Sequence, residues 1–340
     1  MNSEERVMNA LAHKPIDRVP TFEWEISRKL IEAMTPGADM AEFIERMDID
    51  GIVVHQKYKK DFIDEVTYRD EWGVTKKITA EETDITADGP VKEPEDLEGY
   101  TPPDPCAPYR LDAVKEALDR FKGKRAVILH LNDVFSLPSR IMPFEEFLMA
   151  INTEPEMVDK LIGIVVDYNI KVAKRAWDLG LRIVMTGDDY CYTRGPMFSP
   201  KAFREIFFPW YKKVMRAYKD MGFMVIKHCD GDVMSLIDMI VDPETGIDCY
   251  DPIEPAAGMQ LSYFKEKYGK RICLKGNVDC AQTLTFGTVE DTIQETKECL
   301  RIGMPGYGYI LSSSNSLHSE VKPDNYKALL DTLHEFGVYK

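Results

Sequence analysis

Residues 223–230 read FMVIKHCD, a short apolar run that ends in an imidazole and a carboxylate. Short apolar runs rich in β-branched residues are typical of strands that are buried on both faces of a parallel sheet. Seven further runs of this kind occur along the chain, and each also ends in polar side chains. They span residues 18–25, 49–55, 125–132, 182–189, 246–254, 271–279 and 307–314.

Segments with helical periodicity separate these runs. They include residues 155–179, 200–221, 233–241, 259–268 and 289–302. Alternation of strand and helix predicts a parallel sheet. A doubly wound open sheet would also fit, but it usually carries a glycine-rich phosphate turn after its first strand, and none is present. Eight units therefore favour an α/β fold of the (β/α)₈ TIM-barrel type.

The length of 340 residues suits one barrel domain over residues 1–340. The alternation is interrupted at residues 58–109. There, residues 68–74 suggest a hairpin, and residues 93–108 are rich in proline and acidic side chains. We interpret 58–109 as an insertion over the barrel mouth.

The composition excludes several classes of protein. A formal net charge of −15 argues against nucleic-acid binding, which depends on clustered Lys and Arg. No apolar run is long enough to span a bilayer, and the polar start lacks a signal-peptide core. Seven scattered cysteines indicate reduced thiols rather than a disulfide framework. We therefore expect a cytoplasmic protein.

The carboxyl ends of barrel strands converge on one face, where barrel enzymes place their chemistry. Polar and aromatic residues at these predicted ends form the candidate site, although ordinary loop polarity is the alternative for any one of them. We expect catalytic roles for Asp188, Asp189, Glu254 and Asn277. We expect contacts with a cofactor or substrate from Glu23, Trp24, His55, Tyr190 and Asn315.

His228 and Asp230 are the best candidates for metal ligands. Side chains alternate along a strand, so these two point to one side while Cys229 points to the other, toward the core. Imidazole and carboxylate suit zinc, with a further ligand from another strand end. His318 and Glu254 are the preferred partners, and Asn315 is a third candidate. The alternative is a hydrogen-bonded pair without metal.

Several motifs together resemble the uroporphyrinogen decarboxylase superfamily. They lie at residues 5–20, 200–211, 228–232, 251–259, 275–280 and 308–316, and so cover almost the whole chain. The resemblance implies a (β/α)₈ barrel. It also implies one of two activities, porphyrinogen decarboxylation or zinc-dependent methyl transfer in cobalamin-protein systems.

Two departures from the superfamily's patterns distinguish between these activities. The decarboxylases carry an Arg-Gln-Ala-Gly-Arg-Tyr segment whose arginines hold substrate carboxylates, but here residues 21–28 read TFEWEISR. Glu23 and Glu25 would repel a polycarboxylate. The methyltransferases have a His-x-Cys pair and a later Cys as zinc ligands, whereas His228-x-Asp230 replaces the sulfur with oxygen and the later Cys has no counterpart.

The resemblance and these departures imply a zinc-dependent O-demethylating methyltransferase that acts on a small, methoxylated and aromatic compound. Glu254 or Asp188 would protonate the leaving oxygen. The methyl group would pass to a corrinoid (cobalamin) on a partner carrier protein, because the chain has no Asp-x-His-x-x-Gly motif of its own. The expected partners are that carrier, the methyl donor and a second copy in a homodimer. The alternatives are a carboxy-lyase and a non-catalytic binding barrel.

Overall fold

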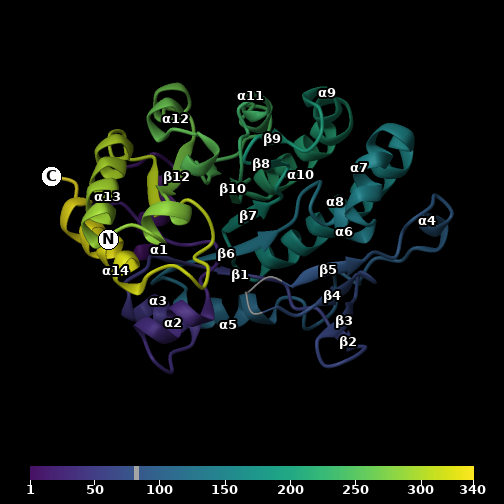
Figure 1. Ribbon diagram of the computed structural model, residues 1–340, viewed down its shortest axis with the longest axis horizontal. Coiled ribbons are helices and arrows are strands. Elements are labelled where there is room, and N and C mark those ends of the chain that lie inside the picture. The colour runs from purple at the N-terminus through teal and green to yellow at the C-terminus, as the bar shows by residue number, and fades with distance from the viewer. Residues whose placement is uncertain (80–83) are drawn as a thin grey trace.

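A curved sheet of seven parallel strands forms the centre of the molecule (Figure 1). The computed structural model describes residues 1–79 and 84–340. In order across the sheet, the strands are β1 (Gly51–Val54), β6 (Ala126–Leu131), β7 (Ile183–Gly187), β10 (Met224–His228), β11 (Cys249–Asp251), β12 (Cys273–Val278) and β13 (Tyr309–Ser313). Each neighbouring pair is parallel, so all seven carboxyl ends lie at one edge. The predicted parallel α/β fold is confirmed by these seven strands.

The first predicted strand, residues 18–25, does not form a regular ladder. It makes single bridges, including a parallel one from Thr21 to Leu311 of β13. On the other side, the N–H of Asp50, just before β1, donates to the carbonyl of Thr21 at 2.8 Å. Pro20 has no N–H to donate, and the N–H of Thr21 donates to the Asp50 carboxylate instead of a strand. The segment thus lies between the two edges of the sheet, but the prediction of an eighth regular strand was wrong.

Helices pack around the outside of the sheet (Figure 1). The longer ones are α1 (Ser3–Leu11), α2 (Arg28–Met34), α3 (Met40–Arg46), α5 (Asp112–Phe121), α7 (Phe144–Thr153), α8 (Pro155–Asp178), α10 (Phe208–Met221), α12 (Leu261–Lys267), α13 (Val289–Gly303) and α14 (Pro323–Phe336). The short ones are α4 (Asp96–Gly99), α6 (Pro138–Ile141), α9 (Pro200–Ala202), η1 (Phe203–Phe207), α11 (Ile237–Ile240), η2 (Pro255–Ala257) and η3 (Cys280–Leu284). None of the described helices is long and apolar enough to cross a membrane.

Local sequence signals explain where several helices begin and end. Pro155 occupies the first position of α8, and Thr288 with Asp291 forms a capping box at the start of α13. Gly222 ends α10 with a φ of 101°, which glycine adopts without strain. The predicted helix over 233–241 was too long, since a turn around Asp232 delays α11 until Ile237.

A separate antiparallel sheet follows β1. Its four strands are β2 (Lys60–Phe62), β3 (Thr67–Asp70), β4 (Thr75–Lys77) and β5 (Ile85–Asp88). The two-residue strands β8 (Cys191–Tyr192) and β9 (Gly195–Pro196), which follow β7, form a separate hairpin. The predicted hairpin at 68–74 is present as the β3–β4 turn. There, Asp70 accepts the N–H groups of Trp72 and Val74, and Gly73 has a φ of 78°. Residues 80–83, within the predicted insertion, lie outside the described residues.

A buried ionic network joins the chain at the amino end of the sheet. Arg6 of α1 donates to Asp50 at 2.5 Å and to Asp17 at 2.7 Å. Arg18 reaches the same Asp50 oxygen at 3.3 Å. Asp50 is fully buried, and its second oxygen accepts the N–H of Thr21 at 2.9 Å. This network holds the first segment against the start of β1.

Candidate functional site

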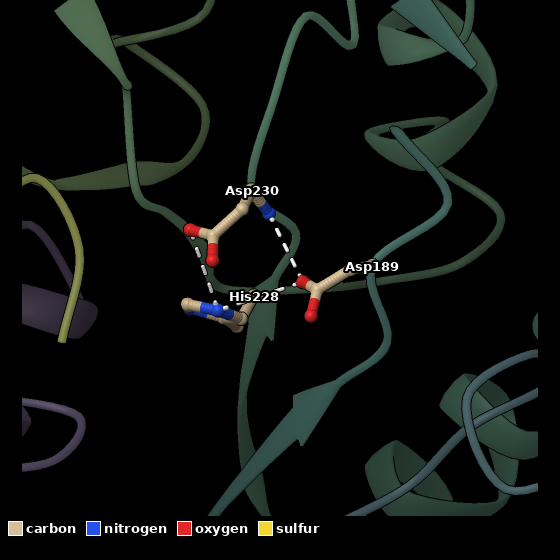
Figure 2. A group of neighbouring side chains, drawn as sticks. All are labelled: Asp189, His228 and Asp230. Atoms are coloured by element: carbon tan, nitrogen blue, oxygen red, sulfur yellow. Dashed lines mark hydrogen bonds and ion pairs between the residues drawn. The ribbon is translucent and has the colours of Figure 1, made fainter. Parts of the chain in front are cut away.

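Three potential metal ligands meet at the carboxyl edge of the parallel sheet. His228 is the last residue of β10, Asp230 follows it, and Asp189 follows the neighbouring strand β7. His228 Nε2 lies 3.8 Å from Asp189 Oδ1 and 3.6 Å from Asp230 Oδ1. Figure 2 shows the three side chains turned toward one another, with the Asp230 N–H donating to Asp189 at 3.2 Å. We call these residues the ligand group.

A second carboxylate orients the imidazole. Nδ1 of His228 lies 2.7 Å from Asp251 Oδ2, and the other oxygen of Asp251 accepts from Lys275 Nζ at 2.7 Å. Trp24 stacks on the ring with centroids 4.2 Å apart. With the Nδ1 proton directed at Asp251, Nε2 faces the ligand group and would offer its lone pair to a metal that displaces its own proton. Metal-binding histidines are commonly oriented in this way by a carboxylate behind the ring.

Charges in the ligand group are only partly compensated. Burial would lower the pKa of His228, but the carboxylates of Asp230 and Asp251 raise it to about 10. Burial, together with Asp189 and Asp251, raises the pKa of Asp230. Asp230 Oδ1 is buried and has no hydrogen-bond partner among the residues described. Such an atom is normally satisfied by a proton, a water or an ion.

The ligand group fits a divalent metal such as zinc. Its candidate donor atoms all lie within 4.8 Å of one another. Ligands about 2 Å from one ion stand within about 4 Å of each other, so small side-chain shifts would bring them to bonding distance. Imidazole nitrogen and carboxylate oxygen are both ordinary zinc ligands, and three protein ligands leave a fourth position open. Asp189, which we expected to be catalytic, thus joins His228 and Asp230.

The ligand group lies on the wall of a cavity of about 360 Å³, which we call the site cavity. Trp24, His55 and His130 form part of the same wall. His55 and His130 contact through their Nδ1 atoms at 3.1 Å. Burial lowers the pKa of His55 to about 4 and that of His130 well below its usual range. These two imidazoles are therefore neutral at physiological pH. The wall also carries acids, Glu25, Asp84, Asp189 and Asp230, and the cations Lys76 and Arg140.

Asp188 and Tyr190 do not reach the site cavity. They flank Asp189 in sequence but point into a buried cluster, where Lys227 donates to Asp133 at 2.6 Å and the Tyr190 hydroxyl donates to the same carboxylate at 2.5 Å. Burial and the nearby Asp133 hold the pKa of Asp188 well above its usual range. The cause is strand geometry, since residues next to Asp189 and His228 face the opposite side.

Glu23 is also buried, at 4% exposure. It accepts both the N–H and the hydroxyl of Ser313, at 3.2 and 2.6 Å, and it is not on the wall of the site cavity. Burial raises its pKa to about 7. Its hydrogen bonds therefore join residues 18–25 to the end of β13.

The remaining predicted residues lie around the edge. Glu254 accepts the Gly231 N–H at 2.7 Å, next to Asp230. Both ring nitrogens of His318 make local contacts away from the ligand group. Nε2 lies 3.3 Å from the Thr285 hydroxyl, and Nδ1 accepts the Glu320 N–H at 3.3 Å. Asn277 accepts from Cys299, and Asn315 accepts from the Ser316 N–H. The structure therefore does not bring His318, Glu254 or Asn315 into the ligand group.

Sequence reasoning did not assign roles to Asp251 and Lys275, which orient His228. Asp251 follows the strand-end pattern, whereas Lys275 lies within β12. Only the pairing of β10 with β11 reveals that His228 and Asp251 lie opposite each other. Asp133 and Lys227 were missed for the same reason, because their contact joins two strands 94 residues apart.

Comparisons with known proteins agree with this architecture. A sequence model of the family described as uroporphyrinogen decarboxylase (URO-D) matches residues 2–336. A methylated-thiol–coenzyme M methyltransferase from Methanosarcina mazei is 24% identical over 58% of this chain, and the match spans only half of that relative's length. A uroporphyrinogen decarboxylase from Psychromonas ingrahamii is 23% identical over 98% of this chain and 97% of its own. A solved methyltransferase structure from Methanosarcina mazei superposes with a TM-score of 0.78 at 19% identity, covering 99% of both chains, and so shares the fold.

Proposed function

The chain belongs to the uroporphyrinogen decarboxylase family, and from that membership we propose that it is a metal-dependent methyltransferase of the O-demethylase type. It moves a methyl group from a small methoxylated compound to a corrinoid on a partner protein. The observation that carries the proposal is the ligand group, with His228 oriented by Asp251 and the Asp230 oxygen left unsatisfied. Decarboxylation without a metal does not require three potential metal ligands to converge.

The roles of the chain's own residues follow from their contacts. Asp251 fixes the tautomer of His228, so that Nε2 faces the ligand group. His228, Asp189 and Asp230 would hold zinc, which supplies Lewis acidity toward an ether oxygen when bound. Asp188 is too deeply buried to reach a substrate. Glu254 is not on the cavity wall itself, but it accepts the Gly231 N–H beside Asp230, and we assign it as the general acid. Burial, with nearby Asp230, raises the pKa of Glu254 and so favours its protonated form.

The reaction balances as follows. The bond between the methyl carbon and the ether oxygen breaks, and the methyl carbon forms a bond to the reduced cobalt(I) of the carrier's corrinoid. The oxygen leaves as an alcohol or phenol after it accepts a proton from Glu254. Cobalt supplies both electrons of the new bond, so no other reductant is consumed.

We also propose that the described parts of the predicted insertion, residues 58–79 and 84–109, cover the mouth of the site cavity. Tyr68, Lys76 and Asp84, from the antiparallel sheet and its flank, lie on the cavity wall. The Tyr68 hydroxyl donates to Asp84 at 2.5 Å, which joins two parts of this cover. A cover of this kind excludes water and strengthens electrostatic interactions inside.

A second candidate, decarboxylation of a carboxylic acid, is favoured by the relatives named uroporphyrinogen decarboxylase, which match along nearly their full length. The charges on the cavity wall argue against a polycarboxylate. Glu25, Asp189 and Asp230 all line it and would repel such a substrate. Of the wall's lysine and arginine, Lys76 is paired with Asp70, which leaves Arg140 alone among the described residues to balance several carboxylates.

One assay separates these functions. The purified protein, loaded with zinc, is mixed with a reduced corrinoid carrier and a panel of methoxylated compounds, and the cobalt absorption is followed. Methylation of the carrier by at least one compound supports the proposal. If no compound methylates the carrier while uroporphyrinogen or a smaller acid loses CO₂ without metal, the second candidate is correct.

A further inference from the structure

A second chamber of about 350 Å³ adjoins the site cavity, and we call it the side chamber. The two share Ser136, Arg140 and Asp189 as wall residues, so they meet at one member of the ligand group. Much of the remaining wall of the side chamber is apolar. It includes Phe135, Pro143, Phe144 and Met197. A molecule in the side chamber would therefore have an apolar surround with one end beside Asp189.

Arg140 is an unpaired cation at the junction of these chambers. Its guanidinium has no hydrogen bond or ion pair with any residue in 1–79 or 84–340. Lys76, another cation on the site-cavity wall, is paired with Asp70 at 2.9 Å. A guanidinium has five N–H donors in a planar fork that matches a carboxylate, and none of those of Arg140 is used by the described chain.

The backbone that carries Arg140 is held firmly. Arg140 lies in α6, and the Val91 N–H donates to the carbonyl of Ile141, the last residue of that helix, at 3.1 Å. Gly89 lies so close that a Cβ there would come within 2.6 Å of the Arg140 carbonyl oxygen. The segment after β5 thus presses against α6, and the guanidinium extends from a fixed point on the wall.

We propose that the side chamber binds the methyl donor and that Arg140 binds a carboxylate on it. The substrate class is then a methoxylated aromatic carboxylate, with its carboxylate at Arg140 and its ring against the apolar residues Phe135 and Met197. This inference rests on the proposed function and deepens it by naming the donor. A single guanidinium balances a single carboxylate, which agrees with an otherwise acidic cavity.

An anionic group on the carrier's corrinoid could instead reach Arg140. The apolar residues near Arg140, which are Phe135, Pro143 and Phe144, favour the donor, because an aromatic ring packs against them. The experiment therefore measures the two sources separately.

The first measurement is binding, which needs no turnover. Calorimetry compares para-methoxybenzoate with its neutral near-isostere para-methoxybenzamide on the purified, zinc-loaded protein. We expect the carboxylate to bind at least about tenfold more tightly, as a charge-assisted pair requires. Arg140→Gln should abolish this preference, and Arg140→Lys should retain part of it because the charge remains without the fork.

Arg46→Gln is the matched control, since Arg46 is an exposed arginine at the end of α3 and lies on neither chamber wall. The ratio of the two affinities is measured within each variant, so partial misfolding does not alter it. Equal binding of benzoate and benzamide by the unaltered protein, or an undiminished preference in Arg140→Gln, would overturn the assignment.

Methyl transfer to the carrier gives the second measurement. Arg140→Gln should raise the KM for the carboxylated donor by at least about tenfold and leave the KM for the carrier unchanged. A raised KM for the carrier alone would assign Arg140 to the corrinoid and overturn the proposal. Carboxylate binding that depends on Arg140 without any methyl transfer would leave this assignment standing and refute the proposed function. Methyl transfer from para-methoxybenzoate and para-methoxybenzamide with equal KM would support the proposed function and refute the Arg140 assignment.

Discussion

The two ends of the parallel sheet treat buried charge in opposite ways. At the amino end, Asp50 accepts from Arg6, Arg18 and the Thr21 N–H, so both of its oxygens are satisfied. At the carboxyl end, a buried oxygen of Asp230 has no hydrogen-bond partner among the described residues, and its ion pair with His228 Nε2 is long, at 3.6 Å. At the amino end, the chain itself satisfies the buried carboxylate. At the carboxyl end, our account requires a bound metal to satisfy it.

This difference separates residues that maintain the fold from residues that carry the chemistry. In barrel folds the amino face generally contributes stability and the carboxyl face contributes catalysis. The same strand can serve both ends. Asp248, just before β11, pairs with Lys219 at 2.5 Å, whereas Asp251, at the end of β11, orients His228. The predictions below test this division, beginning with the largest effect.

His228→Ala should abolish methyl transfer, by about a thousandfold or more, because the only imidazole of the ligand group is removed. The metal-free variant should remain folded, although its free energy of unfolding falls, because the removed ring is buried, stacks on Trp24 and pairs with Asp251. Steady-state rates and chemical denaturation measure the two effects. Unfolding of the variant under native conditions would show that His228 is structural.

Asp50→Asn should have the reverse effect. It leaves Arg6 and Arg18 without their shared buried carboxylate, and the loss of one partner of a buried pair costs about 3–5 kcal/mol in free energy of unfolding. Zinc affinity of the folded fraction should not change. Denaturation and metal titration provide the measurements, and a loss of zinc affinity without a loss of stability would contradict the division between the two ends.

Part of this division could be predicted from the sequence. Seven apolar runs gave the strands of the sheet, because continuous burial leaves a clear pattern, and alternation placed His228 and Asp230 together. Residues 18–25 were predicted wrongly as a strand, since the carboxylate that takes the Thr21 N–H lies at Asp50, 29 positions away. The predicted partner His318 faces Thr285 instead, while Asp189 is near His228 only because β7 pairs with β10. Contacts across strands depend on the register of strand pairing, which cannot be read from a single sequence.

Glu23→Gln tests an acidic side chain at the carboxyl end of the sheet that stabilises the fold through its hydrogen bonds to Ser313. Burial raises the pKa of Glu23 from its ordinary 4.5 to about 7, so the folded state binds this proton more tightly than the unfolded state. Its contribution to stability is therefore fully present below about pH 4.5 and is lost as the pH rises through about 7. The loss is on the order of 3 kcal/mol. The difference in unfolding free energy between the two proteins should change by this amount across that range, and a constant difference would refute the burial argument.

Asp251→Asn should lower zinc affinity by about ten- to hundredfold, as the loss of an orienting partner behind a histidine ligand does. Asp248→Asn, near the other end of β11, is the matched control. It removes the pair with Lys219 and should reduce stability without changing zinc affinity. Metal titration of both variants makes the comparison, and equal zinc affinities in the two would show that Asp251 does not position His228.

The central claim is that the carboxyl end of the sheet is completed by a metal. The most direct test is diffraction at the zinc absorption edge from crystals grown with zinc, using the unaltered protein and His228→Ala. The account predicts one anomalous peak about 2 Å from His228 Nε2 and from oxygens of Asp189 and Asp230, and its absence from the variant. A zinc peak at His318 or elsewhere, with the ligand group empty in the unaltered protein, would contradict it.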